Sequence, residues 1–350
     1  MKTFTLLCIF VCSASFLQAQ AGPSEPDTLI QEFFNFDPTP VMLPAPTGDD
    51  DNWVNYDTDQ APTLCVLNLP TPFGWYWESD LGHAVPDESN NFAFTSCSWV
   101  DRQISNETNR NWLIIRAITI PDSNYALAWR SLPFQGPMYM DGYKVLLSTN
   151  SNDPASGDFT DTLFQAAEMI SGINGIGSLD PADYNFSPGY IHASSFTDTT
   201  YYFLDETEPS APIYRGKLEP HTVSLKNYAG HSVYIAFLHD SEDDNLIQVD
   251  DILVANTITV GTKEADSGIQ DFQIIGNPTR GNTYFTWNLN TAREASLVIA
   301  NQQGQLMLDR KFGRQQQNNW FCNTEHWAPG IYYCTLRTST GISNLRLVRI

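Results

Sequence analysis

The chain has 350 residues, of which 42% are hydrophobic and 13% aromatic, and its formal net charge at pH 7 is −22. This acidic balance argues against binding to nucleic acid or to an anionic membrane, both of which attract basic surfaces. Gly and Pro are frequent and no long stretch has the period of an amphipathic helix, so we expect an all-β protein with many turns.

The N-terminus predicts a secretory signal peptide at residues 1–19. Lys2 precedes a short apolar run, and the small residues Ala19 and Ala21 follow it. The run is too short to span a membrane. A lipoprotein signal ending at Cys12 is the alternative, and Val11 is a poor residue at the position before a lipid-modified cysteine.

A head domain is expected over residues 27–256, where apolar, β-rich runs alternate with turn-forming clusters. Several runs are apolar on both faces, as expected for the inner strands of a sandwich. Residues 159–170 fit either a short helix or a strand. The predicted strands lie at residues 112–118, 126–129, 143–147, 232–238 and 247–254.

An aromatic run at residues 73–77 contains Trp75, Tyr76 and Trp77. Flat aromatic faces suit the C–H surfaces of sugars, which makes this run a candidate glycan platform. Alternating aromatics on a strand also commonly fill a core, and this alternative stays open.

Four cysteines remain once the signal peptide is removed, and they allow three connectivities. Local pairing gives Cys65–Cys97 and Cys322–Cys334, with one bridge in each expected domain. Export to an oxidising compartment favours disulfides, and four free buried thiols are the alternative.

Residues 257–271 are predicted to be a linker, and residues 272–350 a second domain of short strands and hairpins. Eight basic and three acidic residues give this tail a charge of +5. The remainder after Lys2 has nine basic and 37 acidic residues, a charge of −28. Charges of opposite sign indicate two units with different roles.

Catalytic motifs are not evident in the sequence. There is no His-Glu-x-x-His and no Gly-x-Ser-x-Gly, and the histidines are scattered without metal-pair spacing: His83, His192, His221, His231 and His239. We expect no catalysis, although a glycosidase needs only two suitably placed carboxyl groups.

The tail carries a set of motifs in a characteristic order: an Asn-Pro-x-x-Gly start, a mid-domain turn ending in Gly, and Pro-Gly-x-Tyr before the last strands. It resembles the type A sorting domain of the type IX secretion system. The resemblance implies a small immunoglobulin-like β-sandwich, recognition by the secretion machinery and its sortase, export across the outer membrane, and removal of the tail. The head would then be covalently anchored at the surface or released. The motif residues are Asn277, Pro278, Gly281, Gly304, Pro329, Gly330 and Tyr332.

The head resembles the choice-of-anchor J domains, which are related to cleaved adhesin domains and MAM-like jelly rolls. Four patches carry the likeness in order, at residues 90–99, 111–114, 141–149 and 221–252. The resemblance implies a jelly-roll-like β-sandwich and structural Ca²⁺, which prefers several carboxylate oxygens. Its implied ligands are Asp49, Asp51, Asp141, Asp250 and Asp251. A solvated acidic loop is the alternative.

These observations favour an exported, non-catalytic adhesin or binding protein whose partner is a glycan or a host or matrix protein. A secreted hydrolase of unrecognised type and a structural surface protein are the alternatives.

Overall fold

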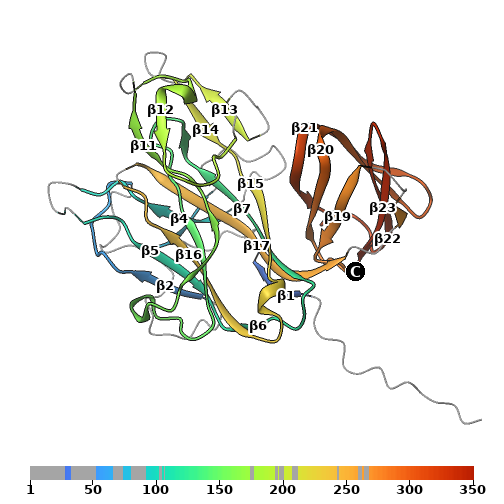
Figure 1. Cartoon of the computed structure of the whole chain (residues 1–350), viewed down its shortest axis with the longest axis horizontal. Helices are drawn as coiled ribbons and strands as arrows, with labels where there is room; N and C mark the ends of the chain where they lie inside the picture. Colours follow the sequence, from blue (N-terminus) through green and yellow to red (C-terminus); the bar gives the residue numbers. More distant parts are fainter. Residues whose placement is uncertain are drawn as a thin grey trace, which may run out of the picture.

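Two β-sandwiches, joined through strand β17 (Leu246–Ile258), make up the structure, a computed structural model (Figure 1). The all-β expectation is confirmed. The described residues are 28–32, 53–65, 74–79, 92–101, 105, 107–173, 177–193, 196, 201–206, 212–242, 244–258, 262–263 and 268–350. The predicted signal peptide, Asp49, Asp51 and parts of the predicted linker lie outside them.

The first sheet of the head is built around β17. This strand pairs with three antiparallel neighbours, and β3 and β15 extend the sheet at its edges. The other strands are β1 (Thr28–Glu32), β3 (Tyr76–Ser79), β4 (Phe92–Cys97), β7 (Tyr125–Pro133) and β15 (Glu219–Ser224).

The second sheet has the order β10-β9-β16-β5-β2, with β6 beside β16. The segment at 159–170 is extended rather than helical, because β10 pairs with β9 and β11 follows it. The strands are β2 (Trp53–Asp57), β5 (Asn111–Ile115), β6 (Ile118–Thr119), β9 (Lys144–Ser148), β10 (Asp161–Gln165) and β16 (Ser232–His239).

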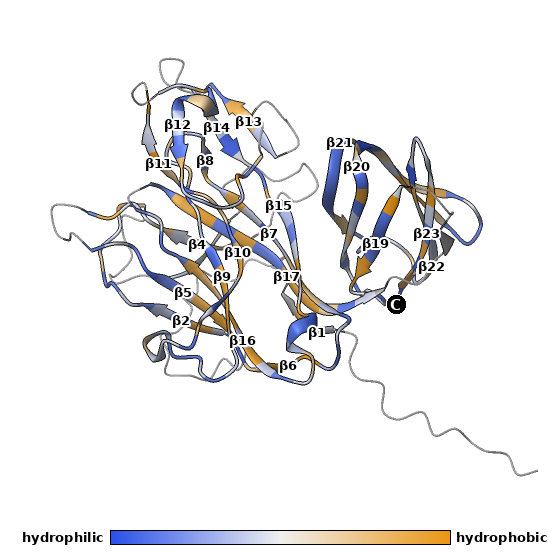
Figure 2. Ribbon diagram, viewed as in Figure 1, coloured by the Kyte–Doolittle hydropathy of each residue, from blue (hydrophilic) through white to orange (hydrophobic). Residues whose placement is uncertain are grey.

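The head core lies between these two sheets. Leu127 and Trp129 of β7 face Ile235 and Phe237 of β16 in one buried cluster. Alternate residues of β16 point the other way, where Ala236 and Leu238 join a second cluster on the outer face. Figure 2 shows the hydrophobic residues concentrated along β16 and β17.

A small lobe covers one end of the head (Figure 1). We use this name for β8 (Gln135–Gly136) together with residues 166–216. The lobe has its own buried cluster around Phe196 and Tyr202, which Met140, a residue just before β9, joins. Its other strands are β11 (Met169–Gly172), β12 (Tyr184–Phe186), β13 (Tyr202–Asp205) and β14 (Ile213–Gly216). Short 3₁₀ turns lie at Pro154–Ser156, Pro181–Asp183 and Lys226–Tyr228.

The tail folds around the 20-residue strand β20 (Asn282–Asn301). The first half of β20 pairs with β19 and the second half with β22, while β21 pairs along both halves. The other strands are β18 (Thr262–Lys263), β19 (Ile269–Ile275), β21 (Leu306–Asn323), β22 (Gly330–Thr338) and β23 (Gly341–Arg349).

Head and tail are in direct contact. The end of β17 pairs with β19, from Thr257↔Ile275 to Ile258↔Ile274, so one sheet runs from the head into the tail. A buried cluster spans the junction, with Ala126, Ala128, Leu253 and Ala255 from the head and Ile275, Tyr284 and Phe321 from the tail. Ala126 and Ala128 are buried on the outer face of β7 because the tail covers that part of the strand.

The cysteines behave differently in the two domains. Cys65 and Cys97 are bonded, as the local pairing predicts. Cys322 and Cys334 are free and buried, so the second predicted bridge is wrong. They lie on β21 and β22, which flank β20 and do not pair with each other; Cys322 is in register with Thr283 and Cys334 with Ile299. Burial raises the pKa of both thiols.

Candidate functional site

The Asn-Pro-x-x-Gly motif of the tail ties its first loop to its last strand. The Asn277 side chain donates to the carbonyl of Arg346 (2.6 Å) and accepts from the amide of Val348 (2.8 Å). The following peptide bond, Asn277–Pro278, is cis. Thr279 adds backbone bonds to Val348 and Ile350. The side-chain amide of Asn277 thus bonds to the backbone of β23 in the way that a neighbouring strand would.

The remaining motif residues shape turns. Gly304 has φ +75 at the hairpin after β20, a backbone conformation that glycine adopts without strain. Gly281 donates its amide to the Thr279 hydroxyl. Pro329 and Gly330 lead into β22, and the Tyr332 hydroxyl donates to the carbonyl of Ala328 (2.6 Å). The motif therefore fixes the connections between strands of the tail.

An open groove of about 1040 Å³ lies on the tail. Four basic side chains line it, with Glu294 as the one acidic residue of the lining: Arg293, Lys311, Arg314 and Arg337. Such a cluster attracts anionic groups. The groove therefore differs in charge from the strongly acidic head.

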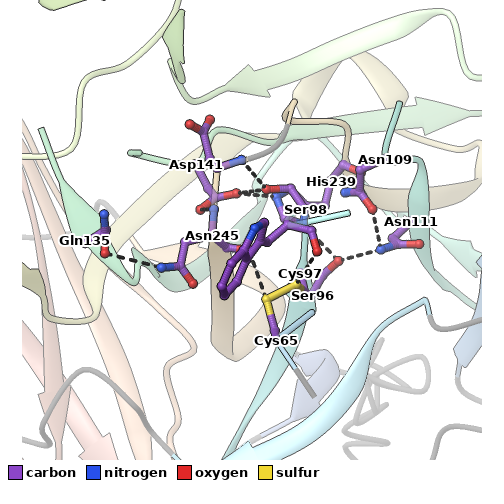
Figure 3. The surroundings of a disulfide bond; sticks show 12 residues. Cys65, Ser96, Cys97, Ser98, Asn109, Asn111, Gln135, Asp141, His239 and Asn245 are labelled. Atoms are coloured by element: carbon purple, nitrogen blue, oxygen red, sulfur yellow. Dashed lines mark hydrogen bonds and ion pairs between the residues drawn. A yellow bond between two sulfur atoms is a disulfide. The ribbon is translucent and has the colours of Figure 1, made fainter. Parts of the chain in front are cut away.

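Asp141, one of the predicted calcium ligands, lies in a buried polar network beside the Cys65–Cys97 disulfide (Figure 3). Its Oδ1 accepts from the Ser98 hydroxyl (2.6 Å) and pairs with His239 Nε2 (3.0 Å). Its Oδ2 accepts from the amide of Asn245 (3.0 Å). Protein donors thus already satisfy this carboxylate.

Asp250 and Asp251 lie in a different place, at the junction with the tail. Arg130 donates to Asp251 Oδ2 through Nε and Nη2 and lies 3.9 Å from Asp250 Oδ2. Asn245, beside Asp141, is five residues from Asp250, or about 17 Å along an extended strand. Asp141 and the Asp250–Asp251 pair therefore lie in separate surroundings. Calcium binding by Asp49, Asp51, Asp141, Asp250 and Asp251 stays a prediction.

The network in Figure 3 also contains a serine–histidine–aspartate chain, because His239 Nδ1 lies 2.9 Å from the Ser96 hydroxyl. That connectivity occurs in acyl-transfer enzymes. Here Ser96, His239 and Asp141 are each 0% exposed, and Asn111 donates to the Ser96 hydroxyl. A substrate has no access to Ser96, so these three hydrogen-bonded side chains stabilise the core.

The predicted aromatic platform is not on the surface. Trp75 and Tyr76 are 1% and 5% exposed, and the indole of Trp75 donates to the carbonyl of Asn111 (3.1 Å). The stacking role is therefore wrong for these two residues, which fill the core as the alternative expected. The side chain of Trp77 lies outside the described residues.

Three side chains from two separate segments of the sequence meet where the small lobe joins the sandwich: His192, Glu219 and His221. Glu219 and His221 are two apart on β15, so both point to one face of the strand. His192 comes from the loop between β12 and β13. The Glu-x-His spacing on a strand is the sequence pattern that could have pointed to this cluster. No sequence pattern connects Glu219 and His221 to His192.

The imidazole of His221 is buried, and burial together with nearby His192 holds its pKa well below the usual value. His192 Nδ1 lies 3.1 Å from Glu219 Oε2. The other oxygen of Glu219 accepts from the Tyr190 hydroxyl at 2.5 Å. The cluster therefore presents a neutral imidazole beside a fixed carboxylate.

The small lobe carries several exposed apolar side chains. Among the described residues, eight large hydrophobic side chains are exposed, and four of them belong to this lobe: Ile170, Ile173, Tyr190 and Leu204. Ile170 is the most exposed of the eight, at 62%. Groups of such residues mark interaction surfaces more often than isolated ones do.

Residues 273–349 match the family described as the secretion system C-terminal sorting domain. No curated protein matches the chain. Among solved structures, the K1 cleaved adhesin domain of Lys-gingipain from Porphyromonas gingivalis is 20% identical, covering 65% of this chain and 98% of its own, with a TM-score of 0.38. The K2 domain of Lys-gingipain is 22% identical, covering 65% and 97%, with a TM-score of 0.35. The adhesin domain of Epf from Streptococcus pyogenes is 10% identical, covering 92% and 97%, with a TM-score of 0.26.

The tail is therefore a sorting domain of the type IX secretion system, as its motifs predict, and it interacts with that machinery. The chain is exported to the cell surface or secreted. None of the helices in the described ranges has the length and hydropathy of a membrane span.

Proposed function

We propose that the chain is a non-catalytic binding protein of the adhesin type, in which the tail directs export and the head binds a partner outside the cell. The observation that carries this proposal is the sorting domain at residues 273–349. Because the tail is the part that the export machinery recognises, the head is the part that can bind a partner at the surface. Recognition by a sortase, followed by covalent anchoring of the head or its release, belongs to the same proposal.

The partner is a protein surface, contacted by the small lobe. The exposed side chains of the lobe are mostly aliphatic, which suits burial against another protein. A glycan partner has less support, because Trp75 and Tyr76 are in the core. The charge of −25 on the head (8 basic and 33 acidic residues at 27–256) favours a partner with a basic rim.

The test measures binding of the full chain to panels of host and matrix proteins and to a glycan array. The double variant Ile170→Asp with Ile173→Asp places charges on the exposed face of the lobe. Leu306→Asp with Tyr333→Asp is the matched control, because these two side chains are equally exposed on the tail.

We expect the lobe variant to lose binding to its protein partner about tenfold or more, and the tail variant to bind like the wild type. Equal binding by both variants would remove the small lobe from the proposal. Binding to glycans alone would replace the protein partner with a glycan, and turnover of a polysaccharide or peptide would favour the hydrolase alternative.

A further inference from the structure

A group of two imidazoles and a carboxylate lies buried where the small lobe meets the main sandwich. One ligand atom from each of His192, Glu219 and His221 lies within 4.8 Å of the others. The three residues are 1%, 5% and 3% exposed. The group joins the loop between β12 and β13 to strand β15, two segments that are otherwise separate in the chain.

The spacing of these atoms is close to that of a metal site. His192 Nδ1 and Glu219 Oε2 are 3.1 Å apart. Two ligands of a tetrahedral zinc ion, each at about 2.0–2.1 Å from the metal, are about 3.3 Å apart. The rings of His192 and His221 are nearly perpendicular, at 84°, with centroids 5.3 Å apart. A single ion bound by all three residues requires the other ligand atoms, which lie within 4.8 Å of one another, to move closer by side-chain rotation.

The histidines also carry unsatisfied nitrogens. Nε2 of His192 and Nε2 of His221 are buried without a hydrogen-bond partner. Buried polar atoms are nearly always paired, and leaving one unpaired destabilises the fold. The His192–Glu219 contact accounts for Nδ1 of His192 and for neither of these atoms. A cation that takes the lone pair of His221 Nε2 accounts for that nitrogen, while the ligand atom of His192 in this geometry is Nδ1, beside Glu219 Oε2.

The surrounding groups hold the carboxylate as the outer partners of a metal site do. The Tyr190 hydroxyl donates to Glu219 Oε1 at 2.5 Å, and the amide of Ala193 donates to Oε2 at 3.3 Å. Imidazole and carboxylate donors together suit Zn²⁺ and similar transition metals, whereas Ca²⁺ and Mg²⁺ prefer oxygen ligands.

We infer that His192, Glu219 and His221 bind one zinc-class divalent cation, which fastens the β12–β13 loop to β15 and so fixes the small lobe on the sandwich. The role is structural, because the three side chains are closed off from solvent. The site stands apart from the proposed function, since an ion can be bound whatever the partner of the head.

The test uses the full chain prepared without a polyhistidine tag. Zinc content after dialysis against Zn²⁺ is measured together with the melting temperature, because an ion that binds only the folded state raises it. Ca²⁺ and Mg²⁺ serve as oxygen-preferring controls. The ligand variants are His192→Gln and His221→Gln, and His231→Gln is the matched control because that histidine is exposed.

Wild type and His231→Gln are expected to retain one Zn²⁺ per chain, and both ligand variants to lose it. Tyr190→Phe keeps the ring and removes one bond to Glu219, so it should weaken zinc binding about 10–100-fold while the protein stays folded. The corresponding control is Tyr333→Phe on the tail, which should leave binding unchanged.

Wild-type protein without zinc, or ligand variants that bind zinc as tightly as wild type, would overturn the inference. If the histidine variants do not fold, Tyr190→Phe and the absorption spectrum of the Co²⁺-loaded wild type decide the matter. A thiolate charge-transfer band that disappears in Cys322→Ala would place the ion at the tail cysteines and refute the site.

Discussion

At the scale of single residues, Asp57 carries an unusual proton affinity. It lies at the end of β2, where its Oδ1 accepts from the amide of Gln60 and its Oδ2 is buried without a hydrogen-bond partner. Burial, followed by repulsion from Asp59, raises the pKa of Asp57 to about 7 from 3.8. The folded state therefore holds a proton that the unfolded state has lost between these two pH values.

This difference makes Asp57 a source of pH-dependent stability. Its contribution is fully present below the unfolded pKa and is lost as the pH rises through about 7, since the fold must then bury a charged carboxylate. Asp57→Asn should flatten the dependence of the melting temperature on pH between about 4 and 7. Asp271→Asn, at an exposed carboxyl, should retain the wild-type slope. Equal slopes in both variants would exclude Asp57 as the titrating group.

Thiol titration separates the two cysteine pairs. Protein that begins after the leader, unfolded without reductant, should expose two reactive thiols, Cys322 and Cys334. Reducing the Cys65–Cys97 bridge, which closes a separation of 32 residues, should lower the free energy of unfolding by about 3–4 kcal/mol. Four reactive thiols would contradict the first bridge, and none would indicate a second bridge in the tail.

At the scale of secondary-structure elements, β17 organises the molecule. A bulge between Asp250 and Leu253 changes which residues face inward, from Ile247 and Val249 to Ile252 and Val254. Asp251 sits at this bulge with φ +51 and holds the tail through two bonds, from Asn282 and from the Tyr284 hydroxyl. One face of β17 therefore packs into the head core, and the other face contacts the tail.

The Arg130 side chain should be the most sensitive point of this junction. It pairs with Asp251 and lies over the ring of Phe321 in the tail, 3.9 Å from the centroid. Arg130→Met removes the cation that faces two buried carboxylates, which should cost about 3–5 kcal/mol in urea unfolding of the full chain. Arg116→Met, at an exposed position, should cost less than about 0.5 kcal/mol. A loss below about 1 kcal/mol for Arg130→Met would contradict a stabilising role.

The sequence predicted those strands whose burial can be recognised from the pattern of apolar residues within a single run. The runs at 126–129, 232–238 and 247–254 alternate or are fully apolar, and each became a central strand. The tail was recognisable from its resemblance to a known family, carried by short motifs in a fixed order, one of which ends at the turn residue Gly304 with its positive φ. Both signals depend only on residues close together in the chain.

Features that depend on pairing between distant segments could not be predicted in this way. The outer face of β7 looks like core, and only the tail explains why Ala126 and Ala128 are buried there. Asp141 bonds to the amide of Asn245, just before β17, whereas Asp250 lies within β17, and composition does not reveal this difference. His192 meets Glu219 only through the fold of the small lobe.

At the scale of the whole molecule, the head and the tail differ in the sign of their charge but share a buried interface. The charges of −25 and +5 indicate separate roles, whereas the shared sheet and the buried cluster show that the two domains pack together before any cleavage. Removal of the tail would expose the outer face of β7 and β17. The exported head therefore differs in its surface from the full chain.

The mass of the protein recovered from the cell surface or the medium tests the central claim most directly. If the tail is a sorting domain that is removed after export, the recovered polypeptide should end within residues 257–271, with or without an added anchor. Recovery of surface or secreted protein that still ends at Ile350 would contradict the account.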